Sequence, residues 1–382
     1  MVCRSGLRAR SLSRISLPSS VMVLALTACG GASAPPASVN GQVTSSSAAS
    51  KPAASTAPAA AGAPVSAAAK PAGLTEIRFG LQANGAAAPV LVGTDDGSDA
   101  AAGVTLTITN FNDTSQALVA VLGGQLDMAI VATGPAAFNA FNRGADVKLI
   151  VSSGQEAPGH AAFLPLIARA DLVDSGAVKT PAQLKGRKVA LVAKGNIAEY
   201  DLARALSTVG LKPQDLDLTT MPFPDMVIAL GNKAIDAAMI VHPIADQAIA
   251  KGVGKIISDD YAPGTQNAVI VASTKFLDQH ADAATNFIAG FVQLVRKLDD
   301  GGLKKDDHAL AILEKYTKTP PAVIRQGPDS FWPKDGRISS KSLQDEEAYF
   351  LEAKELEYSK PLAWPPLIDE HFLDAALKKI GG

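Results

Sequence analysis

The feature that most constrains the fold is a regular alternation of short apolar runs with helical segments. Apolar runs at 76–81, 104–109, 126–131 and 147–152 are bounded by Gly, Pro or small polar residues, which is typical of strands. Segments with helical spacing lie between them, at 115–122 and 136–143. Pro89 predicts the first turn of another helix, and we expect 94–103 to be a polar turn. Strand–helix alternation predicts an α/β fold with mainly parallel sheets.

The alternation then starts again. Strands are predicted at 163–169, 187–193, 216–221, 234–241 and 255–258, with helices at 197–210, 225–230 and 246–251. The run from 117 to 130 is similar to the run from 228 to 239, which suggests two lobes built on one plan. Residues 74–382 also exceed the roughly 250–300 residues that one hydrophobic core usually serves.

The last third of the chain is predicted to be helical. Helical spacing covers 275–299, 304–316, 320–326, 339–358 and 369–380. We expect these helices to pack on the outside of the first lobe. Two segments near 163–170 and 267–273 then cross between the lobes and form the hinge.

The first residues indicate export. The first 20 residues hold four arginines and no acid, and 21–28 is apolar but too short to cross a membrane. Residues 26–29, Leu-Thr-Ala-Cys, are similar to the bacterial lipobox, which implies cleavage before Cys29 and lipid on its sulfur. The alternative is an ordinary signal peptide with an incidental cysteine. We therefore expect a signal peptide at 1–28 and an extracytoplasmic protein attached to the membrane through lipid alone.

A flexible tether is predicted at 29–73. This segment is dominated by Ala, Ser, Pro and Gly, with Lys51 and Lys70 its only charges, so it lacks the apolar residues needed to offset ordering entropy. The chain has two cysteines, Cys3 and Cys29. The folded part therefore has no cysteine for a disulfide, a thiolate metal site or a nucleophile.

Several motifs in a consistent order resemble one family. They are the Ala-Leu to Asp-x-Ala pattern at 117–130, the run at 180–192, Gly-Asn to Tyr at 195–200, Asp236 followed by His242-Pro243, and the end of the chain at 368–381. These segments resemble periplasmic substrate-binding proteins of ABC importers for nitrate, sulfonate, taurine and thiamine-precursor pyrimidines. The resemblance implies the type II periplasmic-binding fold, with lobe 1 at 74–167 and 270–382 and lobe 2 at 168–269.

The resemblance also implies a function. Members of this family close two lobes on a small-molecule solute and deliver it to the transmembrane subunits of an ABC permease, so we expect a monomer without a cofactor. Two positions depart from the family pattern: Asn196 replaces a serine, and His242 replaces the glutamate of a Glu-Pro pair. Both positions tend to face the cleft in the family, so the ligand preference is expected to differ.

The candidate ligand-binding residues lie in loops that follow strands, where clefts form in open sheets. Asn196 can cap the helix that follows Gly195 with its side-chain oxygen. The amides at the start of that helix can hold a polar or anionic group. A plain strand–turn–helix with a capped start explains the same pattern. The alternative for Lys194 is a solvated surface lysine, and the alternative for His242 is a purely structural residue. Trp332 and Trp364 are expected to pack in the protein interior. The candidates are Gln82, Asn84, Thr133, Gly134, Lys194, Gly195, Asn196, Tyr200, Asp225 and His242, followed by Pro243.

Other functions find less support in the sequence. There is no basic patch with interleaved aromatic residues, so nucleic acid is not an expected partner. The chain has five histidines and no His-x-x-x-His cluster, so we expect neither a metal site nor an enzyme. Two alternatives stay open: a secreted enzyme of the same fold acting on a pyrimidine-like substrate, and a module that presents its ligand to a sensor.

Overall fold

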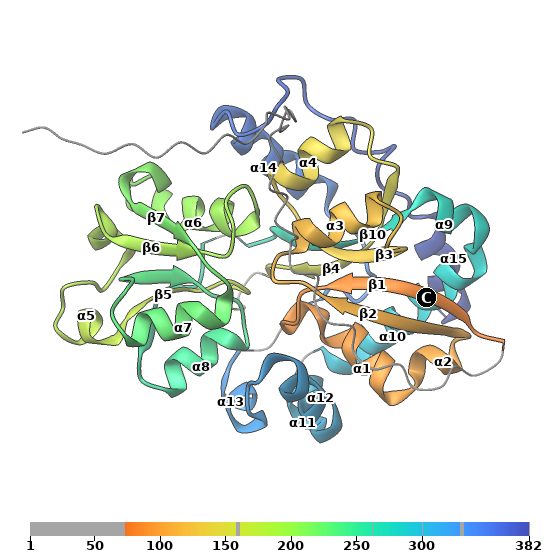
Figure 1. The fold of residues 1–382 in the computed structure, drawn as a ribbon, viewed down its shortest axis with the longest axis horizontal. Helices are drawn as coiled ribbons and strands as arrows, with labels where there is room; N and C mark the ends of the chain where they lie inside the picture. Colours follow the sequence, from red (N-terminus) through yellow and green to blue (C-terminus); the bar gives the residue numbers. More distant parts are fainter. Residues whose placement is uncertain (1–72, 158–160, 262, 300, 329–331, 382) are drawn as a thin grey trace, which may run out of the picture. The chain divides into compact units, whose positions relative to one another are not determined.

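The structure is a computed structural model that describes residues 73–157, 161–261, 263–299, 301–328 and 332–381. The predicted signal peptide, lipidation site and most of the tether lie outside the described residues. The described part contains two five-stranded sheets flanked by helices (Figure 1). The predicted two-lobed α/β fold is therefore confirmed.

The first sheet has the strand order β2-β1-β3-β10-β4, in which β1, β2 and β3 run parallel and β10 is antiparallel to both of its neighbours. Its strands are β1 (Thr75–Leu81), β2 (Val104–Asn110), β3 (Met128–Ala132), β4 (Val147–Gln155) and β10 (Gln266–Ser273). Its flanking helices include α1 (Ala88–Asp96), α2 (Ser98–Ala101), α3 (Thr114–Leu122) and α4 (Pro135–Asn142).

The second sheet has the order β7-β6-β8-β5-β9, in which β6 is parallel to β7 and β8 and β5 is antiparallel to its neighbours. Its strands are β5 (Leu166–Arg169), β6 (Lys188–Leu191), β7 (Asp217–Thr220), β8 (Ala237–Met239) and β9 (Gly254–Ser258). Its helices are α5 (Ala170–Asp174), α6 (Ile197–Ser207), α7 (Phe223–Gly231) and α8 (Ile244–Ala250).

The two sheets share one local plan. After α3, Gly124 has φ +69, and the equivalent residue after α7, Lys233, has φ +64. The Asp127 carboxylate accepts the backbone N–H of Arg78 at 2.8 Å, and the Asp236 carboxylate accepts that of Lys188 at 3.1 Å. The weak similarity of 117–130 to 228–239 thus corresponds to a repeated helix–turn–strand geometry.

The C-terminal helices cover the first sheet and also reach the second. α10 packs on α1 and α15, whereas α13 contacts α8 and α14 contacts both α4 and α6. These helices are α9 (Thr274–Gln279), α10 (Ala281–Leu298), α11 (Gly302–Lys305), α12 (Asp307–Thr317), α13 (Pro321–Gln326), α14 (Ser340–Glu352) and α15 (His371–Lys379).

Several predicted boundaries were wrong, in three cases because a single residue interrupts an otherwise continuous apolar pattern. The helix expected at 275–299 is divided at His280, whose φ of −137° is not helical. The helix expected at 304–316 is divided at Asp306, which caps α12 through its side chain. Helix α14 ends at Glu352 rather than 358, shortly before Lys354 at φ +60. The expected turn at 94–103 is mostly helical, with a break at Gly97.

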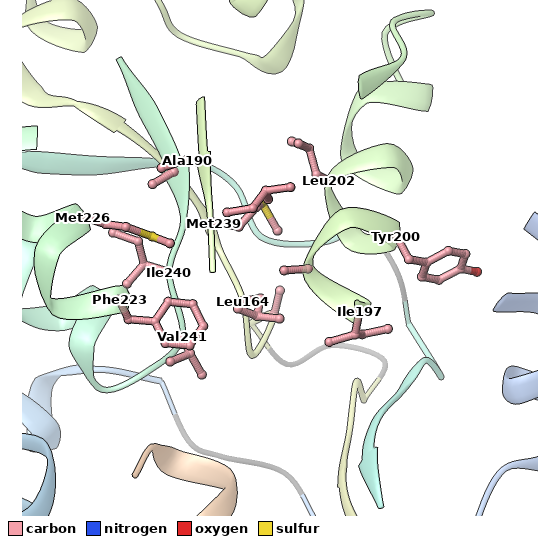
Figure 2. Packing of buried hydrophobic residues seen from close by; sticks show 14 of the residues in the cluster. Leu164, Ala190, Ile197, Tyr200, Leu202, Phe223, Met226, Met239, Ile240 and Val241 are labelled. Atoms are coloured by element: carbon pink, nitrogen blue, oxygen red, sulfur yellow. The ribbon is translucent and has the colours of Figure 1, made fainter. Parts of the chain in front are cut away.

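Buried apolar residues fill both lobes. Figure 2 shows part of the core of the second lobe, in which Ala190 and Met239 of the sheet lie between α6 and α7. The Tyr200 ring points away from this group. Trp332 and Trp364 are 1 % exposed, which confirms their predicted packing role.

Candidate functional site

A small cavity lies where the parallel strands of both sheets end. It is lined by residues that follow β1, β2, β6, β7 and β8, together with the last residues of β3 and the start of β10. Ligand sites in open α/β sheets form at these carboxyl ends. The cavity measures about 40 Å³, room for roughly three water molecules.

Three residues that line the cavity cap helices with their side-chain oxygens. Asn84 accepts a hydrogen bond from Ala86 N at 3.0 Å, Asp113 from Ser115 N at 3.0 Å, and Asn196 from Ala198 N at 3.0 Å. Asn, Asp and Ser are favoured N-caps because they satisfy such orphan amides. Each cap therefore satisfies one backbone amide in the first turn of a helix that begins beside the cavity.

Asn267 joins the cavity wall to the connection between β4 and β5. Its Nδ2 donates to the Glu156 carboxylate at 2.8 Å, and the same carboxylate accepts Phe163 N at 2.9 Å. Asn267 is 1 % exposed, and its Oδ1 has no hydrogen-bond partner. A buried acceptor without a partner is costly to the folded state.

The rest of the wall is largely apolar. Phe163, Leu164, Ile197, Phe223 and Val241 all line the cavity. Figure 2 shows Phe223 and Val241 together, with Leu164 and Ile197 on the side toward α6. The combination of an apolar wall with a few polar groups is typical of small-molecule sites.

Loops from the two lobes touch beside the cavity. Gly85 N donates to His242 O at 3.0 Å, and Ala136 N donates to Gly195 O at 3.2 Å. Gly134 has φ +129, and a Cβ placed on it would lie 2.7 Å from Asn196 Cα. Position 134 therefore requires glycine for two reasons, its positive φ and this close approach to the Asn196 backbone.

Three buried carboxyl groups lie on elements from both lobes. Burial raises the pKa of Glu156 to about 7 and the pKa of Glu346 to about 8. Burial also raises the pKa of Asp201 well above its usual value, and the charges of Glu156 and Glu346 add to this effect. Neither carboxylate oxygen of Asp201 has a hydrogen-bond partner. A carboxyl group in such surroundings favours its neutral form.

The structure brings only part of the predicted site together. Gln82, Asn84 and Asn196 line the cavity. Thr133 is buried beside it, where its hydroxyl donates to Gln266 O at 2.8 Å, and Gly134 forms the inter-lobe contact described above.

The other predicted residues lie elsewhere. Lys194 and Gly195 line a separate open groove of about 570 Å³. Tyr200 packs its ring against Tyr349 of α14, with centroids 5.3 Å apart. Asp225 is exposed on the first turn of α7.

His242 and Pro243 line a different small pocket, where His242 Nδ1 lies 3.0 Å from the Asp246 carboxylate. His242 is buried at 5 % exposure, and its Nε2 has no hydrogen-bond partner. The backbone N–H and C=O of His242 bond to Phe163 O and Gly85 N, so this residue joins three segments.

Sequence reasoning missed Asp113, Thr114 and Asn267. Asp113 and Thr114 follow β2, so the rule that placed candidates after strands would have found them if it had been applied to that loop. Asn267 sits within a strand, where alternation gives no reason to single out one polar side chain.

Within the described ranges, no three His, Cys, Asp or Glu residues are grouped as metal ligands would be. In the same part of the chain, no helix combines the length and hydropathy that a membrane span requires.

Comparisons with known proteins agree on the fold. The alkanesulfonate-binding protein SsuA from Xanthomonas axonopodis pv. citri, solved with MOPS bound, is 18% identical with a TM-score of 0.64, over 79% of this chain and 100% of that chain. The nitrate-binding protein NrtA from Synechocystis PCC 6803 is 15% identical with a TM-score of 0.68, over 80% and 89%. The desulfurization enzyme DSZB is 14% identical with a TM-score of 0.56, over 80% and 99%.

Comparison with curated proteins gives no significant sequence match. The model of the NMT1-like family, however, matches residues 70–312, more than half of the sequence. The chain belongs to the NMT1-like family.

Proposed function

We propose that this protein is an extracytoplasmic solute-binding protein that captures a small molecule between its lobes and delivers it to an ABC permease. The observation that carries the proposal is the cavity at the strand ends of both sheets, with loops from the two lobes in contact beside it. Family membership adds support, since SsuA and NrtA are named as binding proteins for alkanesulfonate and nitrate. The family resemblance of the sequence suggests sulfonates, nitrate, taurine and pyrimidine precursors as candidate solutes.

The contacts between the lobes suggest how the permease distinguishes the loaded protein from the empty one. In the arrangement described here, Gly85 bonds to His242 and Ala136 to Gly195, which is a closed state with little free volume. Solute enters after the lobes separate, and closure around it gives the permease a form that differs from the empty protein. The solute stabilises the closed form by mass action, since it binds that form best.

Binding is tested by thermal unfolding of the purified protein against a solute panel, followed by calorimetry on the hits. A ligand at about 100 times its dissociation constant adds about 2.7 kcal/mol to the free energy of unfolding. Phe223→Ala, which alters the wall, should abolish the shift, whereas Tyr349→Phe on α14 should preserve it. A hit that survives Phe223→Ala would place binding outside this cavity.

Delivery is tested by uptake. Cells that lack the chain should lose uptake of the identified solute, and the gene supplied in trans should restore it. Normal uptake in the deletion strain would remove the transport role and favour presentation to a sensor. The enzyme alternative, which has the desulfurization enzyme DSZB as a structural relative, predicts turnover of the bound compound by the purified protein. Our proposal predicts its recovery unchanged.

Lipid anchoring through Cys29 belongs to the same proposal and lies outside the described residues. Cys29→Ser should move the protein from the membrane fraction to the soluble extracytoplasmic fraction. Retention on the membrane after that substitution would show that another attachment holds it.

A further inference from the structure

Helix α6 of the second lobe packs against helix α14, which is fixed to the first lobe. The Tyr200 ring, which points out of the second-lobe core in Figure 2, meets the Tyr349 ring at 5.3 Å and the Phe350 ring at 6.1 Å between centroids. The Ser342 hydroxyl of α14 accepts Gln266 N of β10 at 2.8 Å, which ties α14 to the first sheet. We call the contact between α6 and α14 the seam. Because its two sides belong to different lobes, a change in the angle between the lobes changes this contact.

A buried carboxyl group lies on each side of the seam. Asp201 of α6 and Glu346 of α14 are both 0 % exposed. Both oxygens of Asp201 and Oε2 of Glu346 have no hydrogen-bond partner, so three of the four carboxyl oxygens are unpaired. A buried carboxyl group with so few partners is stable when it is neutral and costly when it is ionised.

The groups around Asp201 do little to stabilise its charge. The charges of Glu156, in the connection between the sheets, and of Glu346 repel it. Arg204 attracts it from one turn further along α6, but the guanidinium is on an exposed residue. Tyr261 also faces Asp201, and its hydroxyl already donates to a backbone carbonyl. Asp201 therefore has repulsive neighbours and no donor among the described residues.

Glu346 has hydroxyl neighbours and one more carboxylate. Its Oε1 accepts the Ser342 hydroxyl at 2.9 Å. The hydroxyls of Ser342 and Thr133 lower the pKa of Glu346, whereas burial and the charge of the exposed Asp345 raise it. Burial has the largest effect, so the pKa of Glu346 still rises to about 8.

A second acidic pair flanks the seam. Glu199 of α6 raises the pKa of Glu355, which follows α14, and Lys194 opposes this effect. The Glu199 carboxylate also accepts Gly195 N at 2.8 Å. The seam thus combines aromatic packing, which holds the two lobes together, with acidic groups on both sides that repel one another when they are ionised.

We propose that the seam is a proton-controlled latch, in which protonated Asp201 and Glu346 let the lobes close without solute and ionisation of both carboxyl groups opens them. Ionisation places two like charges in a buried contact, and separation of the lobes lets water solvate both. The latch goes beyond solute binding and does not depend on it, since neither carboxyl group lines the cavity.

The direction of the pH effect follows from proton linkage. Both groups bind a proton more tightly in the closed form, so closure is favoured below the ordinary pKa of a carboxyl group and is lost as pH rises through the raised values. For Glu346 this window runs from 4.5 to about 8. Within it, each carboxyl group that moves from the seam into water lowers the closed-to-open ratio by up to about tenfold per pH unit.

The test measures the distance between the lobes without solute. Cys3 and Cys29 are the only cysteines of the chain, so the full-length protein with Cys3→Ser and Cys29→Ser can be spin-labelled at introduced cysteines. Val119 on α3 and Ile228 on α7 are 68 % and 63 % exposed, so Val119→Cys and Ile228→Cys place one label on each lobe. Double electron–electron resonance records the distance at about pH 5 and about pH 8.5, on the two sides of the window. Circular dichroism checks that the protein is folded at both pH values.

The labelled protein should show one distance at the lower pH and a second distance at the higher pH, with a change of at least tenfold in the ratio of the two populations. Asp201→Asn combined with Glu346→Gln imitates the protonated latch and should keep the low-pH distance at both pH values. Glu352→Gln is the matched control, because Glu352 is exposed at the end of α14, and it should respond to pH as the unsubstituted latch does.

Three results would overturn the latch. The first is a distance that does not change with pH when Asp201 and Glu346 are both present, which needs no variant of either group. The second is a pH response that persists in the double variant, and the third is a response that Glu352→Gln abolishes equally. If the double variant does not fold, Asp201→Asn and Glu346→Gln are measured singly, and each must weaken the pH response. The solute panel tests the binding function separately, so the two proposals fail independently.

Discussion

The buried carboxyl group of Glu346 gives a quantitative prediction. Glu346 is fully buried on α14; its Oε1 accepts the Ser342 hydroxyl at 2.9 Å, and its Oε2 has no hydrogen-bond partner. Burial raises its pKa from 4.5 to about 8. The folded protein therefore binds this proton more tightly than the unfolded chain does, and the replacement Glu346→Gln imitates the protonated form without titrating.

The sign follows from proton linkage. A carboxyl group with a raised folded-state pKa contributes stability that is fully present below its unfolded pKa and is lost as pH rises through the folded pKa. For Glu346 the window runs from its unfolded pKa of 4.5 to about 8. At about 1.4 kcal/mol per pKa unit, the loss across it is on the order of 5 kcal/mol. The raised pKa values of Glu156 and Asp201 act in the same direction.

The assay is denaturant unfolding of the wild type and Glu346→Gln at about pH 5 and about pH 8.5, conditions on the two sides of this window. We expect similar free energies of unfolding at the lower pH and a clear advantage for Glu346→Gln at the higher pH. Glu352→Gln is the control, because Glu352 is exposed at the end of the same helix. Parallel pH profiles for the wild type and Glu346→Gln would show that Glu346 does not titrate with a raised pKa.

Three further substitutions test the packing around the site. Gly134→Ala should lower ligand affinity roughly tenfold, because an alanine at φ +129 is strained by about 1–3 kcal/mol and its Cβ meets the Asn196 backbone. Calorimetry measures the affinity, and an unchanged value would refute the close approach. Asn196→Ala removes the cap of α6 and should lower the free energy of unfolding by about 1 kcal/mol, whereas Asn196→Asp should not; equal losses would argue against capping. Trp364→Phe removes the indole N–H that donates to Glu347 at 2.9 Å and should cost about 1–3 kcal/mol in denaturant unfolding; a neutral result would contradict that buried bond.

Much of the architecture could be predicted because it depends on local patterns. The alternation of strands and helices gave two α/β lobes, and Gly195 with Asn196 predicted the turn and cap that begin α6. Boundaries failed where one residue with non-helical backbone, such as His280, interrupts an apolar repeat that continues on both sides. A hydrophobic pattern indicates which face of a helix is buried. It does not indicate whether the backbone hydrogen bonds continue without a break along that helix.

The site was only partly predictable. Asn84 and Asn196 were found because both follow strands, but the same rule also selected Lys194 and Asp225, which lie elsewhere. A position after a strand fixes the loop and leaves open the direction in which each side chain points.

The sequence by itself determined the elements, their alternation and the resemblance to a binding-protein family, since these depend on spacing along the chain. Only the tertiary structure decided which groups meet at the cavity. Asn267 and Glu156 are far apart in sequence, yet their contact leaves one amide oxygen unpaired on the wall. Asp113 becomes the only charge among the described lining residues because the lysine of the neighbouring loop points elsewhere. Such juxtapositions depend on how two sheets face each other, and no local pattern encodes that arrangement.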